Sequence, residues 1–200
     1  DTKNSMNERC KFSSNEEQKI SVIVTVSKFS GCKQRDNNGG AIYIENCGLE
    51  CANSLFEDCI SFTGGGGAIY FIKSITVHEN NINLTNIKFK SCKAVYGGAL
   101  YIYSISRSSD ISVSFCSFQS NDILNRESLS VYQLFGGSSV FLTARIGIFL
   151  NCSFSGNKGE GGSFKIFGNF EQKMESSLYI HFFEKDSKQI EELTANFYAR

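Results

Sequence analysis

The sequence has no proline and no tryptophan, and it has only two histidines among 200 residues. Because an average composition includes about 5% proline, the turns of this chain must come from other residues, chiefly its 18 glycines. No stretch approaches the roughly 20 consecutive apolar residues of a membrane-spanning helix. The opening residues, DTKNSMNERC, contain no apolar signal core. We therefore expect no membrane span in this segment and interpret the chain as a fragment of a larger one.

An excess of either charge is missing as well. The 20 Lys and Arg residues equal the 20 Asp and Glu residues in number, and the basic residues form no cluster. A surface that follows a phosphate backbone needs such a cluster, so we expect no nucleic-acid partner. A chain of this length can bury one sizeable core, and we expect residues 1–200 to form a single domain.

The sequence does contain a repeat, which is built on phenylalanine. A Phe followed three places later by Cys or Asn recurs with an average spacing of about 28 residues, which is within the range of solenoid repeats. The copies begin at Phe12, Phe29, Phe56, Phe89, Phe118 and Phe154, and a degenerate copy begins at Phe183.

Double glycines alternate with the Phe motifs, and each begins a segment with alternating apolar residues. They are Gly39-Gly40, Gly66-Gly67, Gly97-Gly98, Gly136-Gly137 and Gly161-Gly162. Since successive side chains of a strand point to opposite faces, the second and fourth residues after each pair should face the core. These inward positions are Ile42, Ile44, Ile69, Phe71, Leu100, Ile102, Ser139, Phe141, Phe164 and Ile166, and the outward positions between them are Tyr43, Tyr70, Tyr101, Val140 and Lys165.

The pattern predicts an all-β fold. Short strands with the same residue types at the same phase suit a coil that stacks on itself about 4.8 Å per turn. We expect a right-handed parallel β-helix of about seven rungs and three sheets, with repeats over roughly residues 10–186. Apolar residues at helical spacing within 187–200 indicate either a short C-terminal capping helix or an effect of truncation. The expected inward column consists of Phe29, Phe56, Phe89, Phe118 and Phe154.

The motifs GGA[IL] and FxxN resemble the paired repeats of chlamydial polymorphic outer membrane proteins, which also occur in large surface proteins of some protozoan parasites. GGAI or GGAL stands at Gly39, Gly66 and Gly97, and FxxN stands at Phe12, Phe118 and Phe154. The resemblance covers roughly residues 10–185 and implies a pectin-lyase-like β-helical surface protein associated with adhesion to host cells. In this chain Cys replaces Asn in the three middle Phe copies, and Ser replaces Ala in the last two Gly copies.

Polysaccharide lyases and hydrolases also use this fold, and their sites need carboxylates grouped on neighbouring strands. The acidic residues Asp36, Asp58, Asp110 and Asp122 fall at different phases of the repeat, and the histidines His78 and His181 lie in different repeats. We therefore expect no catalytic residues, no cofactor and no metal. A carbohydrate-active β-helix enzyme is the alternative.

The eight cysteines include no CxxC pair of the kind that binds zinc or carries out redox chemistry. Cys32, Cys59 and Cys92 share one phase, and Cys116 and Cys152 share another. Neighbours in a column would lie about 4.8 Å apart, within the range of Cα distances that a disulfide spans. Two interpretations stay open. The cysteines form either a column of reduced thiols that act as small apolar groups, or disulfides that link neighbouring rungs in an oxidising compartment.

Asn83-Leu84-Thr85 and Asn151-Cys152-Ser153 are acceptor sequons for N-glycans in a secreted eukaryotic chain. Asn83 falls in the insertion between the second and third GGA copies. We expect a surface loop there, which makes Asn83 the better glycosylation candidate of the two.

The outward residues Tyr43, Tyr70 and Tyr101 are the repeated exposed feature with binding chemistry. On consecutive rungs they would form a flat aromatic strip about 10 Å long, which suits sugar rings or an extended peptide. A tyrosine ladder that only stabilises the sheet is the other interpretation. The leading hypothesis is a non-enzymatic adhesion module, at the cell surface or secreted, whose partner is a host-cell surface protein or glycan. A purely structural stalk is a further alternative.

Overall fold

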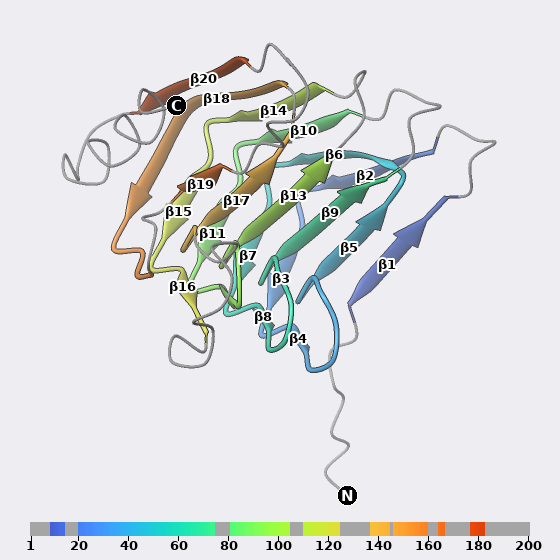
Figure 1. Ribbon diagram of the computed structural model, residues 1–200, viewed down its shortest axis with the longest axis vertical. Helices are drawn as coiled ribbons and strands as arrows, with labels where there is room; N and C mark the ends of the chain where they lie inside the picture. The colour runs from blue at the N-terminus through green and yellow to red at the C-terminus, as the bar shows by residue number, and fades with distance from the viewer. Residues whose placement is uncertain are drawn as a thin grey trace, which may run out of the picture.

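The computed structural model describes residues 9–14, 20–74, 81–104, 110–124, 137–144, 146–159, 164–166 and 177–182. In these ranges the chain is all-β and contains no helix, so none that could cross a membrane. Every strand pairing among these residues is parallel, and the described strands build sheets of six, ten and four strands. The fold is a parallel β-solenoid, as the repeats predict (Figure 1).

Sheet 1 has six strands, which Figure 1 shows side by side with their arrowheads in the same direction. In spatial order they are β1 (Cys10–Ser13), β5 (Ile42–Glu45), β9 (Ile69–Lys73), β13 (Leu100–Ser104), β17 (Val140–Thr143) and β19 (Phe164–Ile166).

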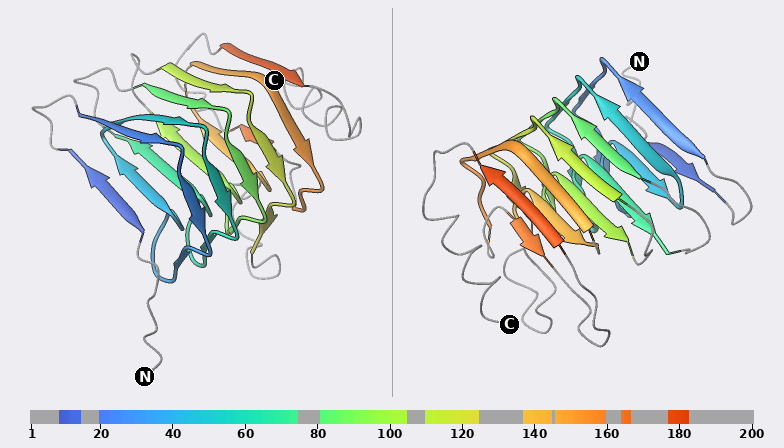
Figure 2. Two further views of the ribbon diagram at one scale, coloured as in Figure 1. Left: turned by 180° about the vertical axis from the view of Figure 1, so that it is seen from behind. Right: turned by 90° about the horizontal axis from the view of Figure 1, so that it is seen from above.

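Sheet 2 has ten strands and two arms, because the long strand β18 pairs in both of them and bends where they meet (Figures 1 and 2). The first arm contains β2 (Ser21–Thr25), β6 (Gly48–Ala52), β10 (Ile82–Thr85), β14 (Asp110–Ser114), β18 (Ile146–Ser155) and β20 (Ser177–Phe182). The second arm contains β3 (Lys28–Ser30), β7 (Leu55–Glu57), β11 (Lys88–Lys90), β15 (Ser117–Gln119) and the end of β18.

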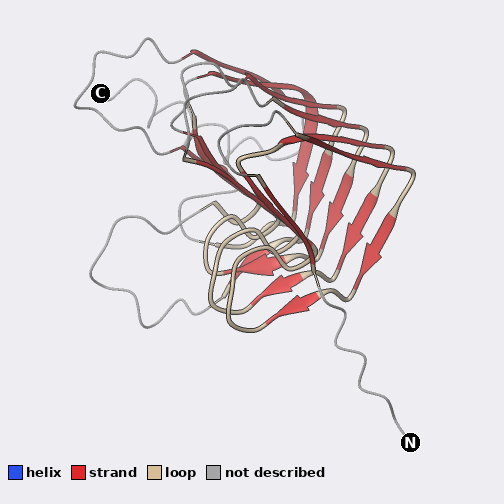
Figure 3. Cartoon of the chain, turned by 90° about the vertical axis from the view of Figure 1, so that its right-hand side faces the viewer, coloured by secondary structure: helices blue, strands red, loops and turns tan. Residues whose placement is uncertain are grey.

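Sheet 3 consists of four two-residue strands. They are β4 (Lys33–Gln34), β8 (Ile60–Ser61), β12 (Lys93–Ala94) and β16 (Asp122–Ile123). One coil passes through sheet 1, the two arms of sheet 2 and then sheet 3, for example through β5, β6, β7 and β8, before β9 begins the next coil (Figure 3).

The predicted phenylalanine column lies inside the second arm. Neighbouring rings are stacked with centroids 4.7, 5.3, 4.8 and 4.7 Å apart along the column Phe29, Phe56, Phe89, Phe118 and Phe154. The three middle rings are fully buried, and the two end rings are partly buried against the same core. In-register pairing places each ring on its equivalent in the next coil, so one residue type repeated at one phase fills this part of the core.

The Phe-x-x-Cys/Asn motif forms the turn between the second arm and sheet 3. Its third residue has a left-handed backbone, with φ of 65° at Gly31, 53° at Asp58 and 54° at Ser91. Its fourth residue is buried and bonds back to the previous coil: the Asn121 side chain donates to the carbonyl oxygen of Phe89 and accepts from the amide of Cys92. The motif therefore links neighbouring coils as well as turning the chain.

The double glycines lie where the chain enters sheet 1. The first glycine has a left-handed backbone, for example φ 65° at Gly66. A Cβ on the second glycine, Gly67, would lie 2.5 Å from the carbonyl oxygen of Lys93 and even closer to that of Gly98. The first glycine thus meets a conformational need and the second a steric one, because the next coil leaves no room for a side chain.

One predicted copy of the repeat is wrong. Phe12 lies in sheet 1, where it pairs with Ile44, and it is 37% exposed instead of joining the column above Phe29. The step of 17 residues from Phe12 to Phe29 is too short to pass through all three sheets, whereas the step of 27 residues to Phe56 completes a coil. Lys11 accordingly lies beside Tyr43.

The register predicted for the fourth glycine copy is wrong by one residue. Val140 pairs with Leu100 in the core and Phe141 pairs with Tyr101, so Ser139 and Phe141 are not the inward pair, and Val140 is not outward. Gly137 has φ 71° and takes the place of the first glycine, while Ser138 takes the place of the second. The double glycine at 136–137 therefore marked the wrong residue as the start of the strand.

Several expectations fall outside the described residues or go beyond what they show. The degenerate copy at Phe183 and the cap expected at 187–200 lie outside. The count of about seven rungs and the right-handed sense of the coil stay predictions. Connections between parallel strands of one sheet are almost always right-handed, which supports the predicted sense.

Replacement of Phe89 by Ala should lower the free energy of unfolding by about 3–5 kcal/mol, because it removes a fully buried ring with neighbours on both faces. Chemical denaturation measures the effect. Phe62→Ala, at a ring that is 40% exposed, is the control and should cost less than about 1 kcal/mol. Equal losses for the two variants would contradict the column.

Replacement of Gly67 by Ala should destabilise the protein by roughly 3 kcal/mol or more, since the atoms that the new methyl group meets are all backbone. Gly48→Ala is the matched control, because its nearest neighbour is the movable Ser21 hydroxyl at 3.1 Å and its φ is ordinary. Thermal unfolding of both variants measures the difference. A Gly67→Ala protein as stable as the control would show that the coils do not approach this closely.

Candidate binding surfaces

Sheet 1 carries an aromatic column on the face that alternates with the core. Tyr43, Tyr70 and Tyr101 pair in register, and neighbouring ring centroids are 5.4 and 4.5 Å apart. Phe141 continues the column 5.0 Å from Tyr101. The three tyrosines therefore share one phase, as the sequence predicts, and the corrected register adds a fourth ring.

This column is not the open, flat strip that the sequence predicts. Tyr70 is only 7% exposed, and stacking places the ring faces against one another, so that the faces are not available to a ligand. Tyr96, from the loop before β13, lies against Tyr101 with ring centroids 5.2 Å apart. Burial raises the pKa of Tyr101 to about 12. Binding by Tyr43, Tyr70 and Tyr101 stays a prediction, and the geometry favours a structural ladder.

Cations cover the first ring of this column. The guanidinium carbon of Arg9 lies 4.7 Å from the centroid of the Tyr43 ring, and the Lys11 ammonium lies 5.5 Å from it. Arg9 also donates a hydrogen bond to the carbonyl oxygen of Asn38. Burial lowers the pKa of Arg9, but an arginine stays charged at neutral pH. These contacts link the start of strand β1 to the loop before strand β5.

All eight cysteines are free thiols in the structure. Cys32, Cys59 and Cys92 occupy the fourth position of the Phe motif in three successive coils, and all three are buried. The Cys92 sulfur lies 3.6 Å from the carbonyl oxygen of Phe56 and 3.5 Å from that of Lys90. The structure therefore shows the reduced ladder, while pairing in an oxidising compartment stays a prediction.

Two of the buried thiols, Cys32 and Cys51, lack the environment of a reactive cysteine. Burial raises the pKa of Cys51 to about 11, and hydrogen bonding with Cys59 together with burial raises the pKa of Cys32. Both are protonated at neutral pH, and the thiolate is the nucleophile and metal ligand. Among the described residues no three His, Cys, Asp or Glu side chains are grouped so that they could hold a metal ion.

The adjacent carboxylates Glu57 and Asp58 have separate roles. The Glu57 carboxylate lies 2.8 Å from the Lys90 ammonium and 3.5 Å from that of Lys28. The hydrogen bond and charge of Lys90 hold the pKa of Glu57 below its ordinary value. Asp58 occupies the left-handed turn position. Glu57 is thus an ionised partner of two lysines, which does not suit a general acid.

The two sequon asparagines lie on the first arm of sheet 2 or at its end. Asn83 is in strand β10 and not in the predicted loop, although its side chain is exposed. Asn151 lies in β18 at the bend between the arms, with φ 52° and a partly buried side chain. Exposure still makes Asn83 the better glycosylation candidate, which stays a prediction.

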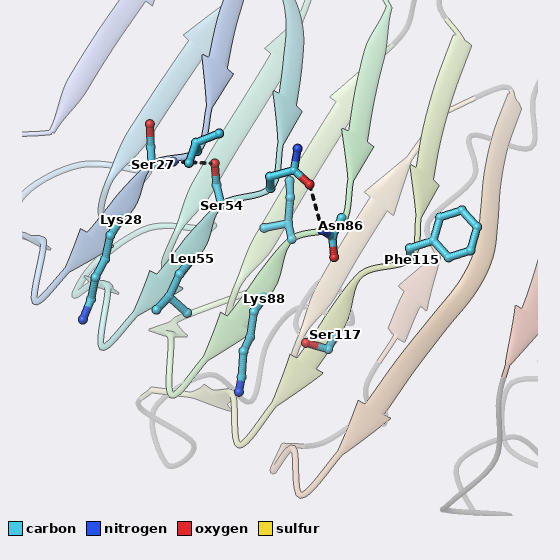
Figure 4. A pocket seen from close by; sticks show the side chains of 11 residues that line it. Ser27, Lys28, Ser54, Leu55, Asn86, Lys88, Phe115 and Ser117 are labelled. Atoms are coloured by element: carbon cyan, nitrogen blue, oxygen red, sulfur yellow. Dashed lines mark hydrogen bonds between the residues drawn. The ribbon is translucent and has the colours of Figure 1, made fainter.

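A shallow groove with a volume of about 500 Å³ crosses the coils where the two arms of sheet 2 meet. On the second arm its lining is a row of outward residues from four neighbouring strands (Figure 4). The row consists of Lys28, Leu55, Lys88 and Ser117. We call this surface the bend groove.

The bend itself supplies the second line of residues in the bend groove. Val26, Asn53, Asn86 and Phe115 line it, and all four have a left-handed backbone, with φ between 46° and 55°. The Asn86 side chain donates a 2.7 Å hydrogen bond to that of Asn53 (Figure 4). Val26 is 81% exposed and Phe115 is 61% exposed. The bend groove thus combines amides, exposed apolar groups and lysines.

Sequence reasoning missed the bend groove, although a signal for it exists. Asn53, Asn86 and Asn151 each stand three residues before a column phenylalanine. Asparagine tolerates a left-handed backbone better than most residues do. An asparagine that recurs three residues before the phenylalanine therefore indicates a turn at this position of the repeat. Val26 and Phe115 occupy the same position in their coils but have apolar side chains.

Replacement of Cys92 by Asn should keep or raise stability, by up to about 1 kcal/mol, since an amide there can bond the Phe56 carbonyl as Asn121 bonds that of Phe89. Cys51→Asn, in strand β6, places the amide in the apolar core and is the control, with an expected cost above roughly 2 kcal/mol. Denaturant midpoints compare the two. Similar destabilisation by both would refute this account of the motif.

No family model matches the chain, and the search found no significant similarity to a curated protein or a solved structure. The parallel β-solenoid is consistent with a β-helix repeat family, which is the architecture that the motifs imply. Membership in the polymorphic outer membrane protein repeat family remains a resemblance of motifs.

Proposed function

We propose that the protein is a non-enzymatic interaction module, secreted or displayed at the cell surface, that binds an extended partner in the bend groove. The partner class is a host-cell surface protein or glycan. The resemblance to adhesion-associated repeats with FxxN and GGA[IL] motifs supports the proposal, since a β-helix with these motifs is what those surface proteins use.

The exposed apolar residues at the bend are the observation that carries this proposal. Val26 and Phe115 have left-handed backbones, with φ of 46° and 55°, and most of each side chain faces solvent. For residues other than glycine and asparagine this conformation costs about 1–2 kcal/mol. The neighbouring coils carry asparagine at the same place. Exposed, strained apolar side chains do not serve the fold, and a role in binding would account for them.

The periodicity of the bend groove favours an extended partner. Each coil contributes one residue to the row on the second arm and one to the bend, so that the lining repeats about every 4.8 Å. A polymer with a regular repeat can make equivalent contacts along several coils. The open, shallow form of the groove is a surface along which such a chain can lie.

Replacement of Phe115 by Asn should separate folding from binding. We expect stability to rise by about 1 kcal/mol, because Asn fits the left-handed backbone better. We expect attachment to immobilised cell-surface proteins or glycans to fall, because the exposed ring is lost. Thermal unfolding and solid-phase binding measure the two effects.

Phe62→Asn is the matched control, at an exposed phenylalanine that does not line the bend groove. It should leave attachment unchanged. Attachment by Phe115→Asn at the level of the unmodified protein would contradict the proposal. Turnover of acidic polysaccharides by the purified protein would favour the carbohydrate-active enzyme instead.

A further inference from the structure

The bend groove is positively charged. Lys28 and Lys88 are the charged residues among those that line it, and both are exposed. Lys28 lies 3.5 Å from Glu57, but Lys90 shares that carboxylate at 2.8 Å. None of the ion pairs found among the described residues involves Lys88. An exposed ion pair of this kind is weak, so both lysines can contact an anionic ligand.

The backbone spacing of these lysines is close to the repeat of one ligand conformation. Lys28 and Lys88 both pair with Leu55, so they lie two coils, or about 9.6 Å, apart. In a polyproline II helix, residues i and i+3 lie on one face and are about 9.3 Å apart. In a β-strand, residues on one face are about 6.6 Å or 13 Å apart, and neither value fits. The lysine pair thus matches carboxylates three residues apart in a polyproline II peptide.

The rest of the bend groove suits the other faces of such a peptide. A polyproline II backbone makes no internal hydrogen bonds and needs external partners. Asn53 and Asn86 are both exposed, and each can bond a ligand through the amide atoms that their mutual 2.7 Å hydrogen bond leaves unused. The apolar side chains of Val26 and Phe115 lie at the bend, beside the lysine row, where they can pack against proline or leucine.

We propose that the bend groove binds an acidic peptide segment in the polyproline II conformation, with carboxylates at positions i and i+3. The inference rests on the proposed interaction function and names its ligand. A peptide is favoured over an anionic polysaccharide because the groove offers exposed apolar side chains beside its two cations.

Fluorescence anisotropy with the purified protein tests the proposal. The probe is a labelled peptide of Glu-Pro-Leu repeats, about twelve residues long, in which the three residue types occupy the three faces of the helix. A permuted peptide of the same composition, with no two Glu three residues apart, is the control. We expect the regular peptide to bind at least about tenfold more tightly. Equal affinities would overturn the proposal.

A pair of double variants tests the site. Lys28→Gln with Lys88→Gln should weaken peptide binding by about tenfold. Lys33→Gln with Lys93→Gln is matched, because Lys33 and Lys93 also flank one residue, Ile60, two coils apart, but on sheet 3 and outside the groove. This control should change affinity by less than about twofold. Equal losses for both variants would show charge attraction without a site and overturn the assignment.

The outcomes also separate this inference from the proposed function. If a sulfated polysaccharide binds and loses affinity in Lys28→Gln with Lys88→Gln, while the peptide does not bind, the peptide assignment is wrong and the interaction function stands. The same holds if attachment to cell-surface material depends on Phe115 but no peptide binds. Absence of both attachment and peptide binding would overturn both proposals.

Discussion

In-register parallel pairing between coils is the constraint on which the rest of this structure depends. It places each residue directly beside its equivalent in the next coil, about 4.8 Å away. A phenylalanine at one phase therefore becomes a continuous stack, with centroids 4.7–5.3 Å apart. The same pairing brings the Asn121 amide to the Phe89 carbonyl and leaves room only for hydrogen at Gly67. Core, turn and close backbone approach all follow from one register.

The register also determines which outward columns stay exposed. On sheet 1 the outward rings stack face to face, so the repeated tyrosines cover one another, and Tyr70 is buried. At the bend of sheet 2 the outward residues instead line a groove, and Val26 and Phe115 remain exposed on a left-handed backbone. A repeated aromatic residue is thus not by itself a binding surface. The proposed function relies instead on exposure combined with backbone strain.

The sequence predicted those features that depend on strict repetition. The phenylalanine column, the glycine turns and the alignment of Tyr43 with Tyr70 all recur at constant phase. The prediction failed at Phe12, where the motif occurs in sheet 1 and not at the turn after the second arm. It also failed at the fourth glycine copy, where Ser138 takes the place of the second glycine and the predicted strand register is off by one residue. Burial of Tyr70 depends on the neighbouring rings on both sides, which the strand pattern alone does not include.

Methyl–methyl nuclear Overhauser effects in isoleucine-, leucine- and valine-labelled protein test the register most directly. Leu100 pairs with Ile69 on one side and with Val140 on the other, across 31 and 40 residues of sequence. The account predicts cross-peaks from the Leu100 methyl groups to those of both Ile69 and Val140. A cross-peak from Leu100 to Ile69 with none from Leu100 to Val140 would contradict it.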